Sequence, residues 1–283
     1  MTICIPLACS LVAVAAAVRS TWSPCGLSML STITPFGERA RGHSYGGTSA
    51  WFVAGATVGG ASLGLLMAAS ALAVRELHPT ETVVGVAALA AALVAVVSDA
   101  GVGRLRLPFH RRQVNERWLD HFRPSVYGMG FGWQIGTGLA TYITTAAVYL
   151  MIVLGALSGR PGLALTVGTG FGMFRGSAVL LTHHVSDPSG LRAFHRRFSA
   201  VGAVVGRVVL GVELGSAVLV ALWLRSLCAG VVVTLVAIGV TTALIRSDRP
   251  GADTSGAPVC PVPTAEVHKD ASLASTGGIH RLG

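Results

Sequence analysis

Charged residues are scarce in this chain, and lysine is almost missing. Only 12% of the 283 residues are Asp, Glu, Lys or Arg, and of the 21 basic side chains one alone is a lysine. A soluble domain carries about twice that charged fraction, so a soluble globular protein is excluded. The sequence also lacks a P-loop, a G-x-G-x-x-G dinucleotide fingerprint and an H-E-x-x-H zinc helix. Conventional kinase or hydrolase chemistry is therefore not expected.

Cysteine is present but not in a pattern that binds metal or builds a disulfide framework. The five cysteines are scattered, and no two of them form a C-x-x-C pair. Three histidines lie near one another at His183, His184 and His195. Adjacent histidines point to different faces of a helix, so they make a poor ligand set. We predict no metal site and no cofactor.

Long apolar blocks make up most of the sequence. The chain is 52% apolar and its mean hydropathy is +0.66. A helix needs about 20 residues to cross the hydrocarbon core of a bilayer, so each block is a candidate span. The pattern predicts an all-α polytopic membrane protein with six or seven transmembrane helices. The predicted spans are 2–35, Ser49–Ala73, Val83–Val102, Gly128–Leu157, Leu163–Leu181, Phe198–Leu224 and Gly230–Ile245.

Arginine is concentrated in alternate loops. Six arginines lie between Arg104 and Arg123, whereas the intervening loops hold single arginines. Arginine-rich loops stay in the cytoplasm, so we predict a bacterial plasma membrane protein with its N-terminus outside and its C-terminus in the cytoplasm. The net charge of +9 is explained by these loops. The lipid bilayer is thus the expected partner, and nucleic acid is not.

The two halves of the chain match each other loosely after a shift of 112 to 114 residues. Gly26-Leu27-Ser28 then falls on Gly138-Leu139-Ala140, and Asp99 falls on Glu213. Three spans per copy is an odd number, so the repeat would be inverted, as in transporters with a site near the midplane. The predicted segments are 1–103 for the first repeat, 104–127 for a basic cytoplasmic loop, 128–224 for the second repeat, 225–246 for an additional transmembrane helix and 247–283 for a disordered cytoplasmic tail.

Two points inside the spans favour broken helices. Ser23-Pro24-Cys25-Gly26 interrupts the first apolar block, and Gly136-Thr137-Gly138 occupies the matching place in the second copy. Proline removes a backbone donor, and glycine adds flexibility. Cys25 is therefore the sharpest candidate residue. A thiol at such a break is either reactive in a cavity or a small buried side chain.

Ionisable side chains inside spans need a reason, because each costs about 2.5–3.5 kcal/mol on insertion scales. Asp99 and Glu213 fall on matching positions, where two carboxyl groups near a common axis could bind a proton or a cation. Alternatively, Asp99 lies at a helix end near Arg104, and Glu213 forms a structural ion pair with Arg175 or Arg207. Glycines also recur every four residues, as at Gly168, Gly172 and Gly176, which favours close helix packing.

Ser23-Pro24-Cys25 resembles the first-repeat motif of the cytochrome c biogenesis transmembrane family, which includes CcdA and the membrane domain of DsbD. The resemblance covers roughly residues 20–220 and implies a proline-broken helix in each of two inverted repeats. It also implies that Cys25 and Pro24 form the reactive centre of a thiol–disulfide electron carrier whose partner is a thioredoxin-like protein. The family's second cysteine would fall near Thr137 or Thr141, and no cysteine lies there.

Three functions follow from these observations. The first is a transmembrane thiol relay that uses Cys25. The second is an exporter of a small solute or ion that shares the inverted-repeat fold, with Asp99 and Glu213 for coupling and Thr137 and Thr141 for substrate. The third is a membrane scaffold without catalysis. The thiol relay requires a reactive Cys25, the exporter requires a carboxyl group, and the scaffold requires neither.

Overall fold

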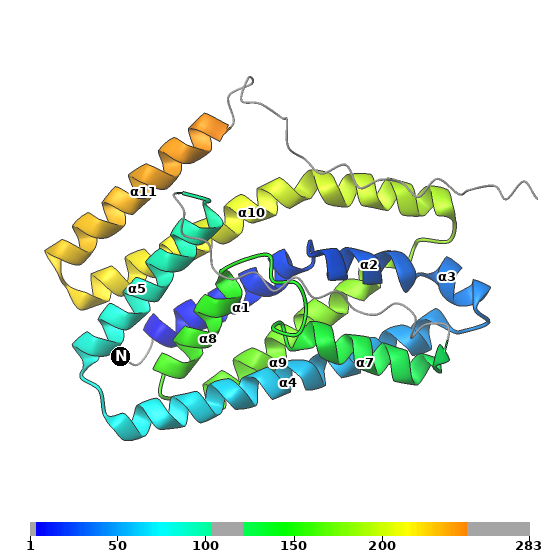
Figure 1. Cartoon of the computed structure of the whole chain (residues 1–283), viewed down its shortest axis with the longest axis horizontal. Helices are drawn as coiled ribbons and strands as arrows, with labels where there is room; N and C mark the ends of the chain where they lie inside the picture. The colour runs from blue at the N-terminus through cyan, green and yellow to red at the C-terminus, as the bar shows by residue number, and fades with distance from the viewer. Residues whose placement is uncertain (1–3, 103–120, 248–283) are drawn as a thin grey trace, which may run out of the picture. The chain divides into compact units, whose positions relative to one another are not determined.

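Every regular element in the described part of the chain is a helix. The computed structural model describes residues 4–102 and 121–247 (Figure 1). The helices are α1 (Cys4–Ser20), α2 (Pro24–Thr32), α3 (Pro35–Ala40), α4 (Tyr45–Leu77), α5 (Glu81–Asp99), α7 (Pro124–Gly136), α8 (Ala147–Leu157), α9 (Pro161–Ser177), the 3₁₀ helix η1 (Ala178–Thr182), α10 (Pro188–Leu224) and α11 (Leu227–Ser247). The predicted all-α class is confirmed.

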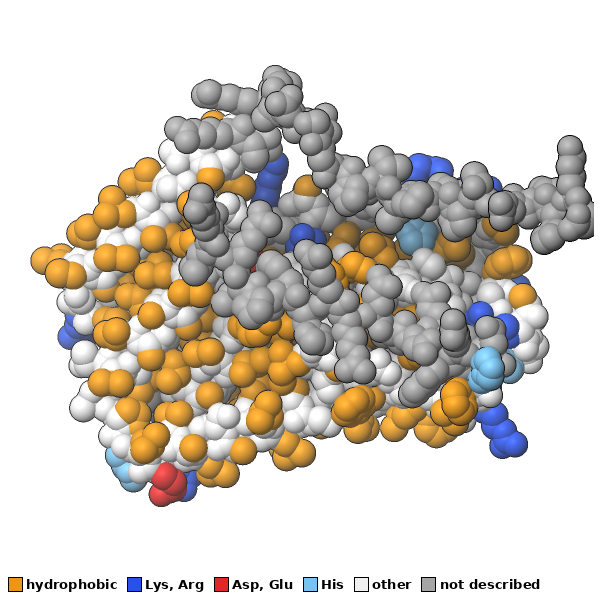
Figure 2. Space-filling model, viewed as in Figure 1, with side chains coloured by type: hydrophobic (Ala, Val, Ile, Leu, Met, Phe, Trp, Pro, Cys, Tyr) orange, Lys and Arg blue, Asp and Glu red, His pale blue; other side chains and the backbone are white. Residues whose placement is uncertain are grey.

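Five helices are long and apolar enough to cross a membrane. They are α4, α5, α9 with its η1 extension, α10 and α11, and the bent pair α1 and α2 gives a sixth if it is one span. Figure 2 shows hydrophobic side chains over the part of the molecule where α5 and α11 lie. Leu227, Val231 and Leu235 are among the exposed apolar side chains of α11. Such a surface suits lipid, and the chain is a polytopic membrane protein.

The first apolar block is broken where the sequence predicts a break. Helices α1 and α2 meet at an angle of 61°. Ser23 caps α2, since its Oγ accepts the N–H of Gly26 at 3.1 Å, and Pro24 occupies the first turn, where a missing N–H costs least. Trp22 fixes the bend from the side: its ring stacks on Phe198 of α10 at 4.1 Å, and its Nε1 donates to the Phe198 carbonyl at 2.9 Å.

The predicted continuous span Gly128–Leu157 is wrong. Helix α7 begins at Pro124 and ends at Gly136, and ten residues without helix separate it from α8. Gly138 adopts a left-handed conformation with φ of 68°, which ends the helix. The Thr137 hydroxyl donates to the Gln134 carbonyl at 2.8 Å. The break itself was predicted at Gly136-Thr137-Gly138, but its length was hidden by the apolar composition around it.

Glycines let α4 approach α7 and α9 until backbones touch. A Cβ on Gly60 would lie 2.4 Å from the Gly168 carbonyl oxygen, and a Cβ on Gly172 would lie 2.2 Å from that of Ala56. A Cβ on Gly136 of α7 would meet the same Ala56 oxygen at 2.0 Å. The predicted packing role of the glycine stripes on α4 and α9 is confirmed. Helix α4 therefore packs closely against both α7 and α9 (Figure 1).

Other predictions concern features that the structure does not test. Most of the basic loop 104–127 and all but one residue of the tail 247–283 lie outside the described residues. The inverted repeat and the side of the membrane on which each terminus lies stay predictions. An inverted repeat would relate two broken segments of the structure, α1–α2 and α7–α8.

Candidate functional site

The two helix breaks meet at one buried arginine. Arg175, on α9, is only 3% exposed. Its Nη1 donates to the Ile135 carbonyl at the end of α7 at 2.7 Å. Its Nη2 lies 3.5 Å from the Ser23 hydroxyl at the first break and 3.4 Å from the Thr141 hydroxyl at the second. The guanidinium of Arg175 therefore contacts both helix breaks and links them.

Cys25 lies in the first turn of α2, within electrostatic range of Arg175. The side chain is 2% exposed and belongs to an apolar cluster with Met29, Phe131 and Ile135. The positive end of α2 and the guanidinium both favour a negative charge here. All four described cysteines are thiols rather than disulfides. The site thus places a buried thiol at the start of a helix and near a guanidinium.

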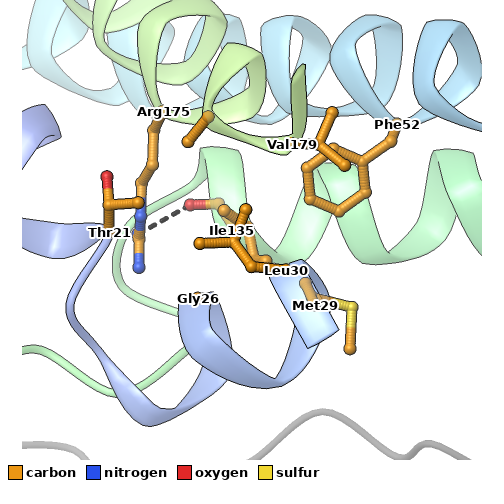
Figure 3. A pocket seen from close by; sticks show the side chains of 9 residues that line it. Thr21, Gly26, Met29, Leu30, Phe52, Ile135, Arg175 and Val179 are labelled. Atoms are coloured by element: carbon orange, nitrogen blue, oxygen red, sulfur yellow. Dashed lines mark hydrogen bonds between the residues drawn. The ribbon is translucent and has the colours of Figure 1, made fainter. Parts of the chain in front are cut away.

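A small cavity of about 20 Å³, enough for one or two waters, adjoins this centre (Figure 3). Figure 3 shows Arg175 reaching from α9 towards the first turn of α2, where Gly26 lies, with Thr21 and Ile135 beside the guanidinium. Met29, Leu30, Phe52 and Val179 supply most of the apolar wall. Gly26 keeps the turn compact, since a Cβ there would lie 2.4 Å from the Thr21 carbonyl oxygen.

The two threonines predicted to bind substrate, Thr137 and Thr141, lie in different surroundings. Thr141 is fully buried and lies beside Arg175, whereas Thr137 ends α7 and bonds within its own turn. Of the two positions expected for a second cysteine, Thr141 is thus the one that shares Arg175 with the first break. It offers a hydroxyl in place of a thiol.

The structure brings the two predicted carboxyl groups, Asp99 and Glu213, together. Their side chains are within hydrogen-bonding reach of each other. Asp99 Oδ2 accepts the Thr145 hydroxyl at 2.5 Å, and Oδ1 accepts the Ala146 N–H at 2.7 Å. Glu213 is fully buried, and its oxygens have no other hydrogen-bond partner among the described residues. The second helix break therefore holds the Asp99 carboxylate in place through the Thr145 hydroxyl and the Ala146 backbone N–H.

Asp99 also borders a larger polar pocket. The pocket has a volume of about 440 Å³ and is lined by Arg19, Thr144 and Arg207 as well as Asp99. Arg19 lies close enough to act electrostatically on Asp99. The predicted ion pair of Glu213 with Arg175 is wrong, because Arg175 bonds to Ile135, Ser23 and Thr141 instead. Arg207 lines the pocket.

One buried polar cluster was missed from the sequence. Glu38 of α3 is fully buried and accepts hydrogen bonds from Arg41 at 2.5 Å, from Thr48 at 2.6 Å and from Tyr127 at 2.8 Å. His43 Nδ1 lies 3.9 Å from the same carboxylate. The signal available in the sequence is an acidic residue directly before Arg39 and Arg41, in a segment whose arginines predict a loop. All its acceptor oxygens are used, so the cluster fastens α3 to α4 and α7.

Comparisons with known proteins give one kind of relative. The chain is 31% identical to the methylamine utilization protein MauF of Methylophilus methylotrophus over 158 residues, which are 52% of each chain. It is 30% identical to MauF of Methylobacillus flagellatus over 55% of each chain, and 31% identical to MauF of Paracoccus versutus over 55% of this chain and 57% of the relative. The chain therefore spans about half the length of the curated relatives it matches. No protein-family model and no solved structure matches it.

Proposed function

We propose that this chain is a multi-pass membrane component of an amine-utilisation system and that it acts as a thiol relay through Cys25. The first part takes up the name of its relatives, which are methylamine utilization proteins. The second part rests on one observation: Cys25 directly follows the Ser23-Pro24 break and lies beside Arg175, which also contacts the second break. The resemblance to the cytochrome c biogenesis transmembrane family points to the same residue.

The relay needs partners, because Cys25 has to exchange its sulfur with other proteins. The Cys25 thiolate attacks a disulfide of one partner, so a mixed disulfide forms and that partner's second sulfur leaves as a thiolate and takes a proton. A thioredoxin-like dithiol then attacks the Cys25 sulfur and releases the first partner fully reduced. The second thiol of the thioredoxin-like protein closes its own disulfide and frees Cys25 as a thiolate. Two electrons have passed from the dithiol to the disulfide.

Burial sets a condition on this chemistry. Since the thiol is 2% exposed, exchange requires the bend between α1 and α2 to open. The small cavity beside Gly26 and Arg175 borders the turn that holds the thiol. Arg175 would then stabilise the thiolate both before attack and after release.

Replacing Cys25 by serine tests the relay. Membranes are quenched with acid, alkylated and separated without reductant, so that mixed disulfides survive. We expect wild type to give a slower-migrating adduct that reductant removes, and Cys25→Ser to lose it completely, because the only relay sulfur is gone. Cys228→Ser is the matched control, since Cys228 is exposed at the start of α11 and should keep the adduct. An adduct that persists in Cys25→Ser overturns the relay.

The amine-utilisation part has its own test. A Paracoccus denitrificans strain without its MauF is supplied with this chain, and growth is measured on methylamine and on succinate. Restored growth on methylamine alone supports the proposal. A chain that reaches the membrane in normal amount but restores no growth contradicts it.

A second function has support from the Asp99–Glu213 contact. An ionised carboxylate only accepts hydrogen bonds, so two carboxyl groups in contact hold a proton between them. Together with the polar pocket, this arrangement fits an exporter of a small solute or ion that couples to a proton or cation. It would work with Asp99 and Glu213 as the coupling pair.

Carbodiimide labelling tests the coupling pair, since an apolar carbodiimide reacts with protonated carboxyl groups in membranes. We expect wild type to be labelled at acidic pH and less so as the pH rises, because the shared proton leaves. The double variant Asp99→Asn/Glu213→Gln should lose the label, whereas the exposed Glu76→Gln should keep it. Equal labelling of wild type and double variant would refute a shared proton.

A further inference from the structure

The pocket beside Asp99 holds charged side chains in the membrane-spanning part of the chain. The end of α1, the second helix break and α10 contribute Arg19, Thr144 and Arg207 to its wall. Arg207 lies near the midpoint of α10, a helix long and apolar enough to cross a bilayer. Charged groups at such positions are costly and mark the pathways of substrates or ions. The pocket is therefore a candidate ligand site separate from the Cys25 centre.

A glycine of α10 leaves room for a ligand in this pocket. The nearest atoms to a Cβ on Gly206 would be those of the Arg19 guanidinium, at 3.8 Å. The guanidinium therefore lies along the bare face of the helix rather than in a packed core. The volume of about 440 Å³ falls within the roughly 300–1,000 Å³ of pockets that bind small molecules. The space suits a small molecule rather than a single ion.

Arg19 can donate hydrogen bonds to such a ligand. Its guanidinium forms no hydrogen bond or ion pair with a described residue. Asp99 attracts it electrostatically, but the Asp99 oxygens already accept hydrogen bonds from Thr145 and Ala146. Arginine presents its N–H groups as a planar fork that matches the two oxygens of a carboxylate. A carboxylate on the ligand is thus the group that Arg19 would bind.

The charges at the pocket set the net charge of the ligand. Arg19 and Arg207 are both cations. Asp99 and Glu213 carry one negative charge between them if they share a proton, so this count rests on the second proposed function. The described side chains at the pocket therefore have one net positive charge. A monoanion balances this charge, whereas a dianion would leave an uncompensated negative charge inside the span.

A hydroxyl group in the pocket wall has no partner. Thr144 Oγ1 is buried and makes no hydrogen bond with a described residue, and Thr144 lines the pocket. A buried hydroxyl without a partner is costly, and a hydroxyl on a ligand can both donate to it and accept from it. Leu210 and Leu244 add apolar wall, which suits a short carbon chain. These features together define an occupant with one carboxylate, one hydroxyl and few carbons.

We infer that this pocket binds a small hydroxy monocarboxylate, with its carboxylate on Arg19 and its hydroxyl on Thr144. The inference deepens the second proposed function, because it names the class of solute that the exporter would carry. The bound carboxylate neutralises Arg19 inside the span. Asp99 borders the pocket and also contacts Glu213, so solute and proton would meet at one carboxyl group.

Equilibrium binding of radiolabelled lactate to the full chain in phosphatidylcholine nanodiscs tests the inference. Wild type should bind lactate in a saturable manner, and succinate should compete poorly because it carries a second negative charge. Arg19→Met should weaken binding at least about tenfold, because the partner of the carboxylate is lost. Arg75→Met, which removes an exposed arginine at the end of α4, should bind as wild type does.

Two further variants change the pocket without removing a contact that the fold uses. Gly206→Phe places a ring in the pocket, where its Cβ meets only the end of the Arg19 side chain, and it should abolish lactate binding. Gly211→Phe on the same helix is the matched control, because nothing lies within 4 Å of a Cβ there. Thr144→Val removes the hydroxyl but keeps the shape, so the preference of wild type for lactate over propionate should disappear.

Three results would overturn the inference: no saturable binding to wild type, unchanged binding in Gly206→Phe, or the wild-type lactate-to-propionate ratio in Thr144→Val. Loss of lactate binding when phosphatidylglycerol replaces phosphatidylcholine would also overturn it, because the anion at Arg19 would then be a lipid head group. Carbodiimide labelling of wild type without lactate binding removes this inference alone. Lactate binding without carbodiimide labelling removes the Asp99–Glu213 coupling pair and leaves the binding site.

Discussion

Gly172→Leu should leave almost no folded protein in the membrane. The Cβ alone would lie 2.2 Å from the Ala56 carbonyl oxygen and 2.6 Å from Gly60 Cα, and backbone atoms cannot rotate away as side chains do. Helix α9 would have to separate from α4, its main neighbour. Overpacking of this kind costs more than about 3 kcal/mol, and it would also displace Arg175, one turn further along.

The matched control is Gly170→Leu, on the same helix. Nothing lies within 4 Å of a Cβ at Gly170, so leucine would only add apolar surface in contact with lipid. Both variants are expressed as fusions to a fluorescent protein and compared by size-exclusion chromatography. We expect Gly170→Leu to give a wild-type peak and Gly172→Leu to give aggregate. Equal peaks would show that α4 and α9 do not touch as described.

Glu38→Gln should lower the melting temperature by several degrees. The substitution keeps the size of the side chain but removes the negative charge that Arg41, Thr48 and Tyr127 share. Removing one partner of a buried ion pair costs several kcal/mol, and because the Arg41 side chain is 25% exposed we expect about 2–3 kcal/mol. The unfolding temperature of purified protein in detergent measures the effect.

Two variants calibrate this loss. Tyr127→Phe removes a single hydrogen bond to the same carboxylate, so about 1 kcal/mol is expected. Glu76→Gln alters a carboxylate that is 73% exposed and should change the melting temperature little. If Glu38→Gln behaved like Glu76→Gln, the buried cluster would not hold α3 in place.

The all-helical fold could be predicted because its causes are local. Apolar blocks of span length and an interrupting proline act within one turn or one helix. The glycine stripe was readable for the same reason, since spacing by four places residues on one helix face. The second break was placed correctly at Gly138, but its ten-residue length was not, because Thr145 and Thr141 bond to Asp99 and Arg175 on distant helices.

The polar sites could be predicted only in part, because they too depend on contacts between distant helices. Asp99 and Glu213 were paired through their matching positions in the sequence, and the structure brings them together. The partners of Arg175 could not be predicted, because a carbonyl at Ile135 carries no signal in its residue type. Glu38 was missed because its burial depends on α4 and α7 packing over a segment that looks like an exposed loop.

The stack of Trp22 on Phe198 has a mechanical consequence. Helix α10 runs unbroken for 37 residues, a stiff rod about 55 Å long at 1.5 Å per residue. One point of this rod is clamped to the hinge beside Cys25, and fifteen residues further along it carries Glu213. Opening the bend between α1 and α2 would either break the Trp22–Phe198 contact or move α10. Movement of α10 would change the distance between Glu213 and Asp99 on α5. Movement at the Cys25 sulfur would therefore change the proton affinity of the Asp99–Glu213 pair, roughly four helical turns away along α10.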